Sequence, residues 1–231
     1  MQPREIDIRT STGRPKLVAH RYSRAEKIGD GLIHILGLTL SVGGGIVLFA
    51  LSSRLGNWSA ISSTSIYTAT LVITLAFSAA YNMWPASGIK SMLRRCDQAA
   101  IFLLIGGTYT VFLAHVAGHV TARFALATIW TAAVLGMLLK LAFPGRFERL
   151  SIAAYLALGW SGLALIPTAI NVLPETALCL IVVGGLLYSI GVIFHLWERL
   201  RFQNAIWHTF VLAAAGCHYG AAVVCSLSMQ T

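Results

Sequence analysis

The segment that decides the fold is ETALCLIVVGGLLYSIGVIFHLW at residues 175–197, which carries one acidic residue and is otherwise almost wholly apolar. A hydrocarbon core of about 30 Å needs about 20 apolar residues in each membrane-spanning helix, and this segment has that length. Only helices and closed barrels satisfy their backbone hydrogen bonds in lipid, and a run this long and continuous is not a barrel strand. The segment is therefore predicted to be a membrane-spanning helix.

Six further segments have the same character, so we predict an all-α bundle of seven membrane-spanning helices. Apolar residues make up 57% of the 231-residue chain and charged residues 11%, a balance outside that of soluble domains. Pro167 lies inside the fifth span and predicts a kink there. The predicted spans are 28–52, 64–84, 98–117, 123–143, 151–172, 175–197 and 204–227. They form a membrane domain at 28–228, preceded by a basic tail at 1–27.

Basic residues are concentrated in alternate connections, and this asymmetry orients the chain. Of the 17 Lys and Arg residues, all but Arg54 and Arg123 fall before the first span or in the second, fourth and sixth connections. The positive-inside rule then predicts a cytoplasmic N-terminus and an external C-terminus. The net charge of +9 lies beside anionic lipid headgroups, and no folded basic domain remains to bind nucleic acid. The tail has no apolar centre, so we expect no cleaved signal and a multi-pass protein of the cell membrane.

Once the spans are oriented, polar residues from four of them, including His34 of the first span, reach one depth near the cytoplasmic face. Ser78 and Asn82 lie near the cytoplasmic end of the second span, and Asp97 begins the third. Asn204 and His208 begin the seventh. Spacing of four residues places each of these pairs on a common helix face. Because polar groups are costly inside a membrane and turn toward partners or a cavity, the sequence predicts a polar site formed by these residues.

The first span carries a polar and small-residue stripe of its own, which indicates close packing inside the bundle. Its members, at helical spacing, are Glu26, Asp30, His34, Gly37, Ser41 and Gly45. His34 lies at a depth of about 10 Å, similar to that of the predicted polar site. We interpret His34 and His218 as packing histidines. His218 lies about 15 Å deeper than His208, so these two cannot share one metal ion.

Five stretches of the chain resemble the hemolysin III family, within the wider superfamily of progestin and adipoQ receptors. They are YSRAEKIGDGLIHILG, FSAAYNMWP, LRRCDQAAIFLLIGGTYTVF, YSIGVIFHLWERL and NAIWHTFVLAAAGCHYGA. The similarity extends from about Tyr22 to Val224 in the same order and with matching loop lengths. It implies seven helices, a cytoplasmic N-terminus and a zinc ion beneath the cytoplasmic face. The implied ligands are a histidine near the end of the second helix and two histidines four residues apart at the start of the seventh.

On this chain the resemblance assigns the ligand positions to Asn82, Asn204 and His208, with Ser78 and Asp97 as supporting residues. His208 is thus the one family ligand that is still histidine. A catalytic zinc site usually has three protein ligands, and a neutral amide oxygen is a poor donor to zinc. We therefore expect a zinc site that is absent or strongly weakened. The alternative is a rebuilt site that recruits Asp97 or His34.

Three functions follow from this sequence. The favoured hypothesis is a receptor-like or lipid-binding bundle whose polar residues form a pocket or hold the helices together. The alternative is a metal-dependent hydrolase of lipid amides or esters, similar to ceramidases. In that mechanism Asp97 orients water or takes its proton, and Ser78 steadies the developing charge, as the catalytic residues. A cytolytic role is implied by the family name, but no amphipathic pore-forming segment supports it. The sequence leaves the substrate, the ligand and the oligomeric state open.

Overall fold

The computed structural model describes residues 22–228, except 55, 86, 117, 119 and 144–147. In this part of the chain seven helical segments are long and apolar enough to cross a membrane, which confirms the predicted all-α class. Their bounds are α1 Arg24–Arg54, α2 Trp58–Met83, α3 Gly88–His115, α4 Val120–Ala142, α5 Glu148–Trp160 with η1 Ser161–Leu165 and α6 Ile166–Ala169, α7 Glu175–Leu196, and α8 Gln203–Ser228.

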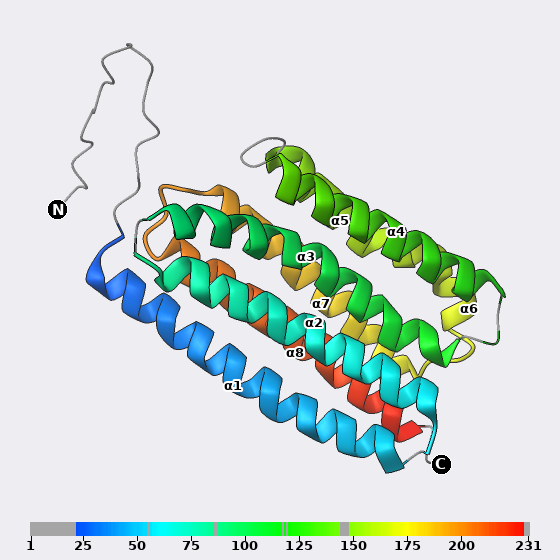
Figure 1. The fold of residues 1–231 in the computed structure, drawn as a ribbon. Coiled ribbons are helices and arrows are strands. Elements are labelled where there is room, and N and C mark those ends of the chain that lie inside the picture. Colours follow the sequence, from blue (N-terminus) through cyan, green and yellow to red (C-terminus); the bar gives the residue numbers. More distant parts are fainter. Residues whose placement is uncertain are drawn as a thin grey trace.

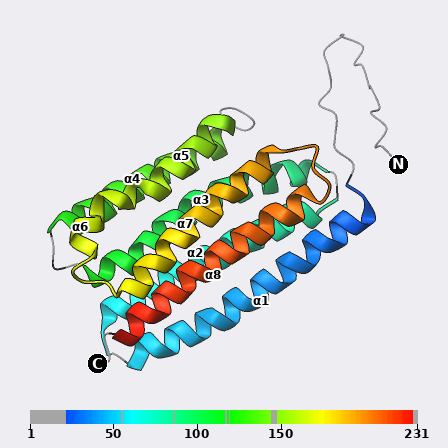
Figure 2. The ribbon, with the colours of Figure 1, turned by 180° about the vertical axis from the view of Figure 1, so that it is seen from behind.

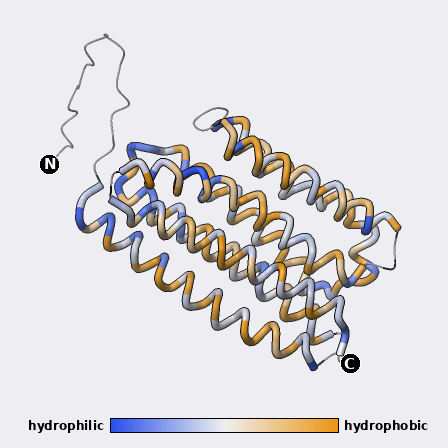
Figure 3. The backbone as a smooth tube through the Cα atoms, in the orientation of Figure 1, coloured by the Kyte–Doolittle hydropathy of each residue, from blue (hydrophilic) through white to orange (hydrophobic). Residues whose placement is uncertain are grey.

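Helices that follow one another along the chain pack side by side, and α8 also packs against α1 (Figures 1 and 2). The contact between the first and last helices joins the two ends of the chain in one bundle. The starts of α1, α3, α5 and α8 therefore lie at the same end as the ends of α2, α4 and α7. We call this end the charged end. Hydrophobic residues cover the lengths of the helices, and hydrophilic stretches gather near their ends (Figure 3).

Two helices begin well before the apolar segments that predicted them, because side-chain caps extend them. The predicted second span begins at 64, but α2 begins at Trp58, where the Asn57 side chain accepts the N–H of Ser59 at 2.9 Å. The predicted third span begins at 98, but α3 begins at Gly88, capped by the Ser87 hydroxyl. An apolar window detects the part of a helix that lies in hydrocarbon, whereas a capped polar turn continues the helix beyond it.

The first helix begins at Arg24, inside the segment predicted to be the tail, and residues 1–21 of that tail lie outside the described residues. Ser23 and Glu26 explain this start. The Ser23 hydroxyl accepts the Glu26 N–H at 3.2 Å, and the Glu26 carboxylate accepts the Ser23 N–H at 2.7 Å. This reciprocal pair is a capping box, which satisfies two backbone donors at the helix start. The other Glu26 oxygen accepts the Phe202 N–H at 3.0 Å and so ties α1 to the beginning of α8.

The fifth span is interrupted before Pro167, in agreement with the predicted kink. Pro167 has no N–H to donate to the Leu163 carbonyl. Regular α-helix ends at Trp160, and Ser161–Leu165 form a tighter 3-10 segment before α6. Short 3-10 segments are a usual way of passing such an interruption.

The polar stripe predicted on the first span is the buried face of α1. Its buried residues are Asp30, His34, Gly37, Ser41, Gly45, Leu48 and Ser52. On the opposite face Leu32 and Ile35 are 62% and 65% exposed, as expected for side chains that face lipid. The bundle therefore turns the polar side of its first helix inward, where it meets α2 and α8.

Glycines let neighbouring helices approach closely. A Cβ atom added at Gly107 of α3 would overlap the side chain of Thr70 on α2, and one added at Gly45 of α1 would overlap Thr68. Small residues at such contacts are typical of membrane helices, because helix association in lipid depends on close packing.

Gly107→Ala is expected to lower the free energy of unfolding by about 1–3 kcal/mol, the usual cost of overpacking a filled contact. Thr70 cannot easily yield, because its hydroxyl is bonded to the Tyr67 carbonyl at 2.9 Å. The thermal unfolding midpoint of the purified protein in detergent measures the effect. Gly43→Ala is the matched control, since a Cβ there meets nothing within 4 Å. Equal midpoints for the two variants would contradict this packing.

Candidate functional site

The site begins with two residues on the inward face of α1. Asp30 and His34 lie one turn apart, and each is only 4% exposed. The His34 Nε2 atom lies 3.6 Å from the Asp30 Oδ2 atom. Within the described part of the chain this nitrogen is buried and has no hydrogen-bond partner. A buried polar atom without a partner is costly, and it often marks a place where an ion or ligand binds.

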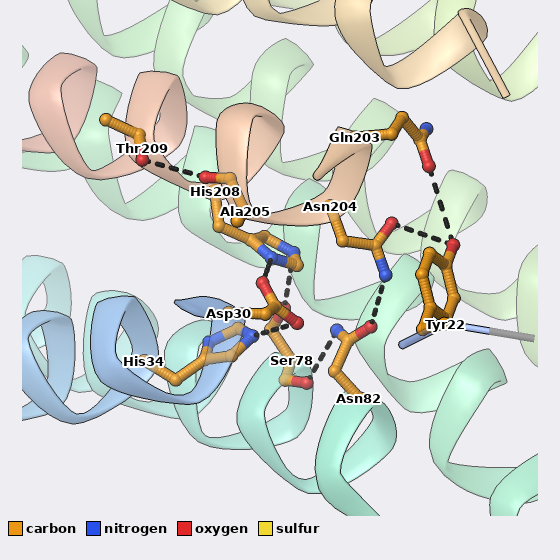
Figure 4. A network of polar contacts seen from close by, with 10 residues as sticks. All are labelled: Tyr22, Asp30, His34, Ser78, Asn82, Gln203, Asn204, Ala205, His208 and Thr209. Carbon is orange, nitrogen blue, oxygen red and sulfur yellow. Dashed lines mark hydrogen bonds and ion pairs between the residues drawn. The ribbon is translucent and has the colours of Figure 1, made fainter. Parts of the chain in front are cut away.

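His208 of α8 meets this pair from the opposite side. Its Nδ1 atom lies 2.6 Å from the Asp30 Oδ1 atom, and its ring centroid lies 4.4 Å from that of His34. Asp30 thus lies between the two imidazole rings (Figure 4). The contact joins the first and last helices of the bundle through a charge-assisted hydrogen bond, which is stronger than a neutral one.

Two further predicted residues lie on the other side of His208. The Ser78 hydroxyl of α2 lies 3.3 Å from the His208 Nε2 atom. The Asp97 carboxylate of α3 interacts with Ser78 and, electrostatically, with His208, His34 and Asp30. Four helices therefore contribute side chains to one cluster.

Asn82 and Asn204, for which the resemblance implies ligand positions, bond to each other. Asn204 donates from Nδ2 to Asn82 Oδ1 at 3.2 Å, and Asn82 donates from Nδ2 to the Ser78 carbonyl at 2.9 Å. Tyr22 donates to Asn204 Oδ1 at 3.2 Å (Figure 4). Burial raises the pKa of the Tyr22 phenol above its usual value, so the hydroxyl remains a donor at neutral pH. Hydrogen bonds of the Asn82 and Asn204 amides thus connect α2 and α8, and we call this pair the amide lock.

Three residues of the cluster carry atoms that could ligate one metal ion: Asp30, His34 and His208. One ligand atom from each lies within 4.8 Å of the others, so the three side chains could hold a metal ion. Two imidazoles and one carboxylate form a common ligand set of catalytic zinc. The His34 Nε2 atom makes no hydrogen bond in the described part of the chain and lies 3.6 Å from Asp30, so it is available as a ligand atom.

The structure brings most of the residues singled out in the sequence into contact and adds Asp30 to them. Ser78, Asn82, Asn204 and His208 are joined by hydrogen bonds, and His34, read from the sequence as a packing residue, faces His208. Asp30 had been noted only as part of the stripe on the first span. Its spacing of four residues from His34 was the available signal, the same spacing that linked Asn204 with His208.

His218 lies away from the cluster, as its depth predicted. Its Nε2 atom lies 3.3 Å from the Ile181 carbonyl, and its ring packs near Phe112 and Tyr188. These contacts agree with its interpretation as a packing histidine.

Fold and site together define a seven-helix, multi-pass protein of the cell membrane with a buried polar cluster at one end. The family described as "Haemolysin-III related" matches residues 22–219. Hemolysin-3 of Bacillus cereus is 34% identical over 190 residues, which cover 82% of this chain and 87% of that protein. The chain therefore belongs to the haemolysin-III related family.

Two further relatives place this family in a wider group. The Hemolysin-3 homolog of Bacillus subtilis (strain 168) is 30% identical over 195 residues, covering 84% of this chain and 91% of that protein. The human monocyte to macrophage differentiation factor is 29% identical over 140 residues, which cover 59% of this chain and 58% of that protein. The human protein belongs to the progestin and adipoQ receptor family, which confirms the superfamily inferred from the sequence.

Asn204→Ala is expected to destabilise the protein by about 1–3 kcal/mol, because it removes the donor to the Asn82 amide oxygen and one acceptor of the Tyr22 hydroxyl. Thermal unfolding in detergent measures this cost. The matched control is Asn171→Ala, which removes an exposed side chain that lies in the turn after α6 and donates to the Pro167 carbonyl. The control should change stability by less than about 0.5 kcal/mol. An amide lock would be refuted by equal effects of the two substitutions.

Proposed function

We propose that this chain is a membrane-embedded hydrolase of lipid amides or esters that holds a divalent metal, zinc being the best match, at Asp30, His34 and His208. The observation that carries the proposal is the approach of these three side chains to within 4.8 Å at a buried place. Asparagine occupies two of the ligand positions that the resemblance implies. Asp30 and His34, together with His208, nevertheless provide three possible ligands. Three protein ligands leave one position open for chemistry.

The remaining residues of the cluster fit the two tasks that hydrolysis requires. A bound zinc ion supplies a Lewis acid, which polarises a carbonyl group and activates water. Asp97 can accept a proton from the attacking water, since its carboxylate lies in the same cluster as His208 and Ser78. Ser78 can donate its hydroxyl to the oxygen on which negative charge develops.

The depth of the cluster favours a lipid substrate. Asp30 lies six residues into α1, which is about 9 Å from the start of that helix. The amide and ester bonds of membrane lipids lie just beneath their headgroups, at a comparable depth. The proposal includes a cytoplasmic N-terminus, as the distribution of basic residues predicts, so that the charged end and its cluster face the cytoplasmic leaflet.

A second candidate function is a receptor-like or lipid-binding bundle without catalysis. The observation that favours it is the amide lock, in which Asn82 and Asn204 satisfy each other at the family's ligand positions. In that case Asp30, His208 and Ser78 hold the helices together by hydrogen bonds. The family zinc site would then be degenerate, as the sequence favoured.

Metal content separates the two candidates. Elemental analysis by inductively coupled plasma mass spectrometry should find about one zinc ion per chain in the protein purified in detergent. The His34→Ala variant should contain much less zinc. His115→Ala is the matched control, because this histidine lies at the opposite end of α3 and bonds to its own helix carbonyl. Asn82→Ala should keep the metal. Loss of zinc from Asn82→Ala but not from His34→Ala would place the metal at the family positions, and absence of zinc from the wild type would favour the second candidate.

Hydrolysis is tested on defined lipids in bilayer discs. Wild type should release fatty acid from a ceramide or an ester lipid, and Asp97→Asn should slow this release by about a hundredfold or more. The zinc content of Asp97→Asn should stay unchanged, which distinguishes lost proton transfer from lost metal. A zinc-loaded wild type that releases no fatty acid from either lipid class would contradict the proposed reaction while leaving the metal site intact.

A further inference from the structure

A second feature at the charged end is a buried lysine. Lys140 lies in the last turn of α4 and is only 5% exposed. Its ammonium donates to the Gln98 side-chain oxygen of α3 at 3.3 Å. A buried ammonium is costly unless a negative charge compensates it, and an amide oxygen carries none.

No carboxylate in the described part of the chain forms an ion pair with Lys140. Among the described residues no carboxylate lies within 4.0 Å of the Lys140 ammonium. Glu148 is near enough to act on Lys140 electrostatically, but it is paired with Arg94 at 2.5 Å. Asp97, the neighbour of Gln98 in sequence, interacts instead with Ser78 and the metal-site residues.

Basic side chains of α3 lie at the same end of the bundle as Lys140. Arg94 and Arg95 lie near the start of α3, and Arg94 acts on Lys140 electrostatically. The Arg95 Nε atom is buried without a hydrogen-bond partner in the described part of the chain. An anion bound here would compensate the Lys140 ammonium, which no carboxylate contacts, and would accept from the unused Arg95 donor.

The position of Lys140 is fixed by its neighbours. Tyr155 of α5 donates to the Gln98 backbone carbonyl at 2.8 Å, and its ring packs on Phe102 at 4.6 Å between centroids. Gln98 is thus held from α5 while it accepts from Lys140 on α4. Three helices contribute to the arrangement, so it is more than a single mobile surface lysine.

We propose that Lys140, with Arg94 and Arg95, binds the phosphate group of an acidic phospholipid at the end of α3, α4 and α5. Lys140 lies two residues from the end of its helix, at the level where lipid phosphates lie. The acyl chains can approach from the side, because Ser151 is the one buried residue of α5 and the rest of that helix faces outward or is half-exposed. Basic pockets between helix ends are a recurrent mode of acidic headgroup binding. This lipid site is separate from the proposed metal site and does not depend on the hydrolase proposal.

Native mass spectrometry of the delipidated protein tests this site. Wild type should bind phosphatidylglycerol at least about tenfold more tightly than phosphatidylcholine, since only the former offers an uncompensated negative charge. Lys140→Gln should weaken phosphatidylglycerol binding by about tenfold, and Lys140→Arg should largely retain it. Lys27→Gln is the matched control, because this exposed lysine lies on α1 at the same end of the bundle and carries the same charge. The control should bind as the wild type does.

Several results would overturn the proposal. Equal affinity of the wild type for the two lipids would exclude a headgroup-charge preference, and equal weakening by Lys27→Gln would indicate general attraction to a basic surface. Inorganic phosphate that raises the thermal midpoint of the wild type as much as phosphatidylglycerol does would assign the site to a free anion. If Lys140→Gln fails to fold, Lys140→Met removes the charge without leaving a buried amide. Unchanged phosphatidylglycerol binding by that variant is a further contradicting outcome.

Discussion

The contact between Asp30 and His208 is the interaction on which the site depends. Its 2.6 Å hydrogen bond connects α1 with α8, the first and last helices, and Asp30 at the same time approaches His34. In lipid such groups find no water, so they remain at this depth only by satisfying one another or a bound ion. The Ser78, Asp97 and amide contacts are arranged around this bridge, and the capping Glu26 fixes the starts of the same two helices.

The two asparagines and the Asp30 cluster are best understood together. An imidazole at position 82 or 204 could ligate zinc, whereas the amides present there bond to each other and to Tyr22. His208 remains in place, but its Nδ1 atom is turned to Asp30. The side chains that could hold a metal ion therefore lie on α1 and α8, and α2 contributes a hydroxyl beside them.

The sequence was sufficient for the seven-helix fold because apolar length is a property of each span by itself. It also placed Ser78, Asn82, Asn204 and His208 at one depth, since helical rise converts residue number into depth. Rotation about the helix axis is set by packing, and the sequence alone did not show that Asp30 and His34 both face His208. Likewise the start of α3 was missed by ten residues, because a Ser87 cap acts outside the apolar window. The pairing of Lys140 with Gln98 joins helices far apart in sequence and carries no local signal.

The account is tested most directly by locating the metal. Anomalous scattering at the zinc edge from crystals of the full chain, grown with zinc, should give one peak between Asp30, His34 and His208. A peak beside Asn82 and Asn204 would contradict the account, because it would restore the family ligand positions in spite of the amides. A zinc-soaked crystal with no peak near His208 would contradict it equally, and would leave the cluster as a hydrogen-bonded connection between the first and last helices.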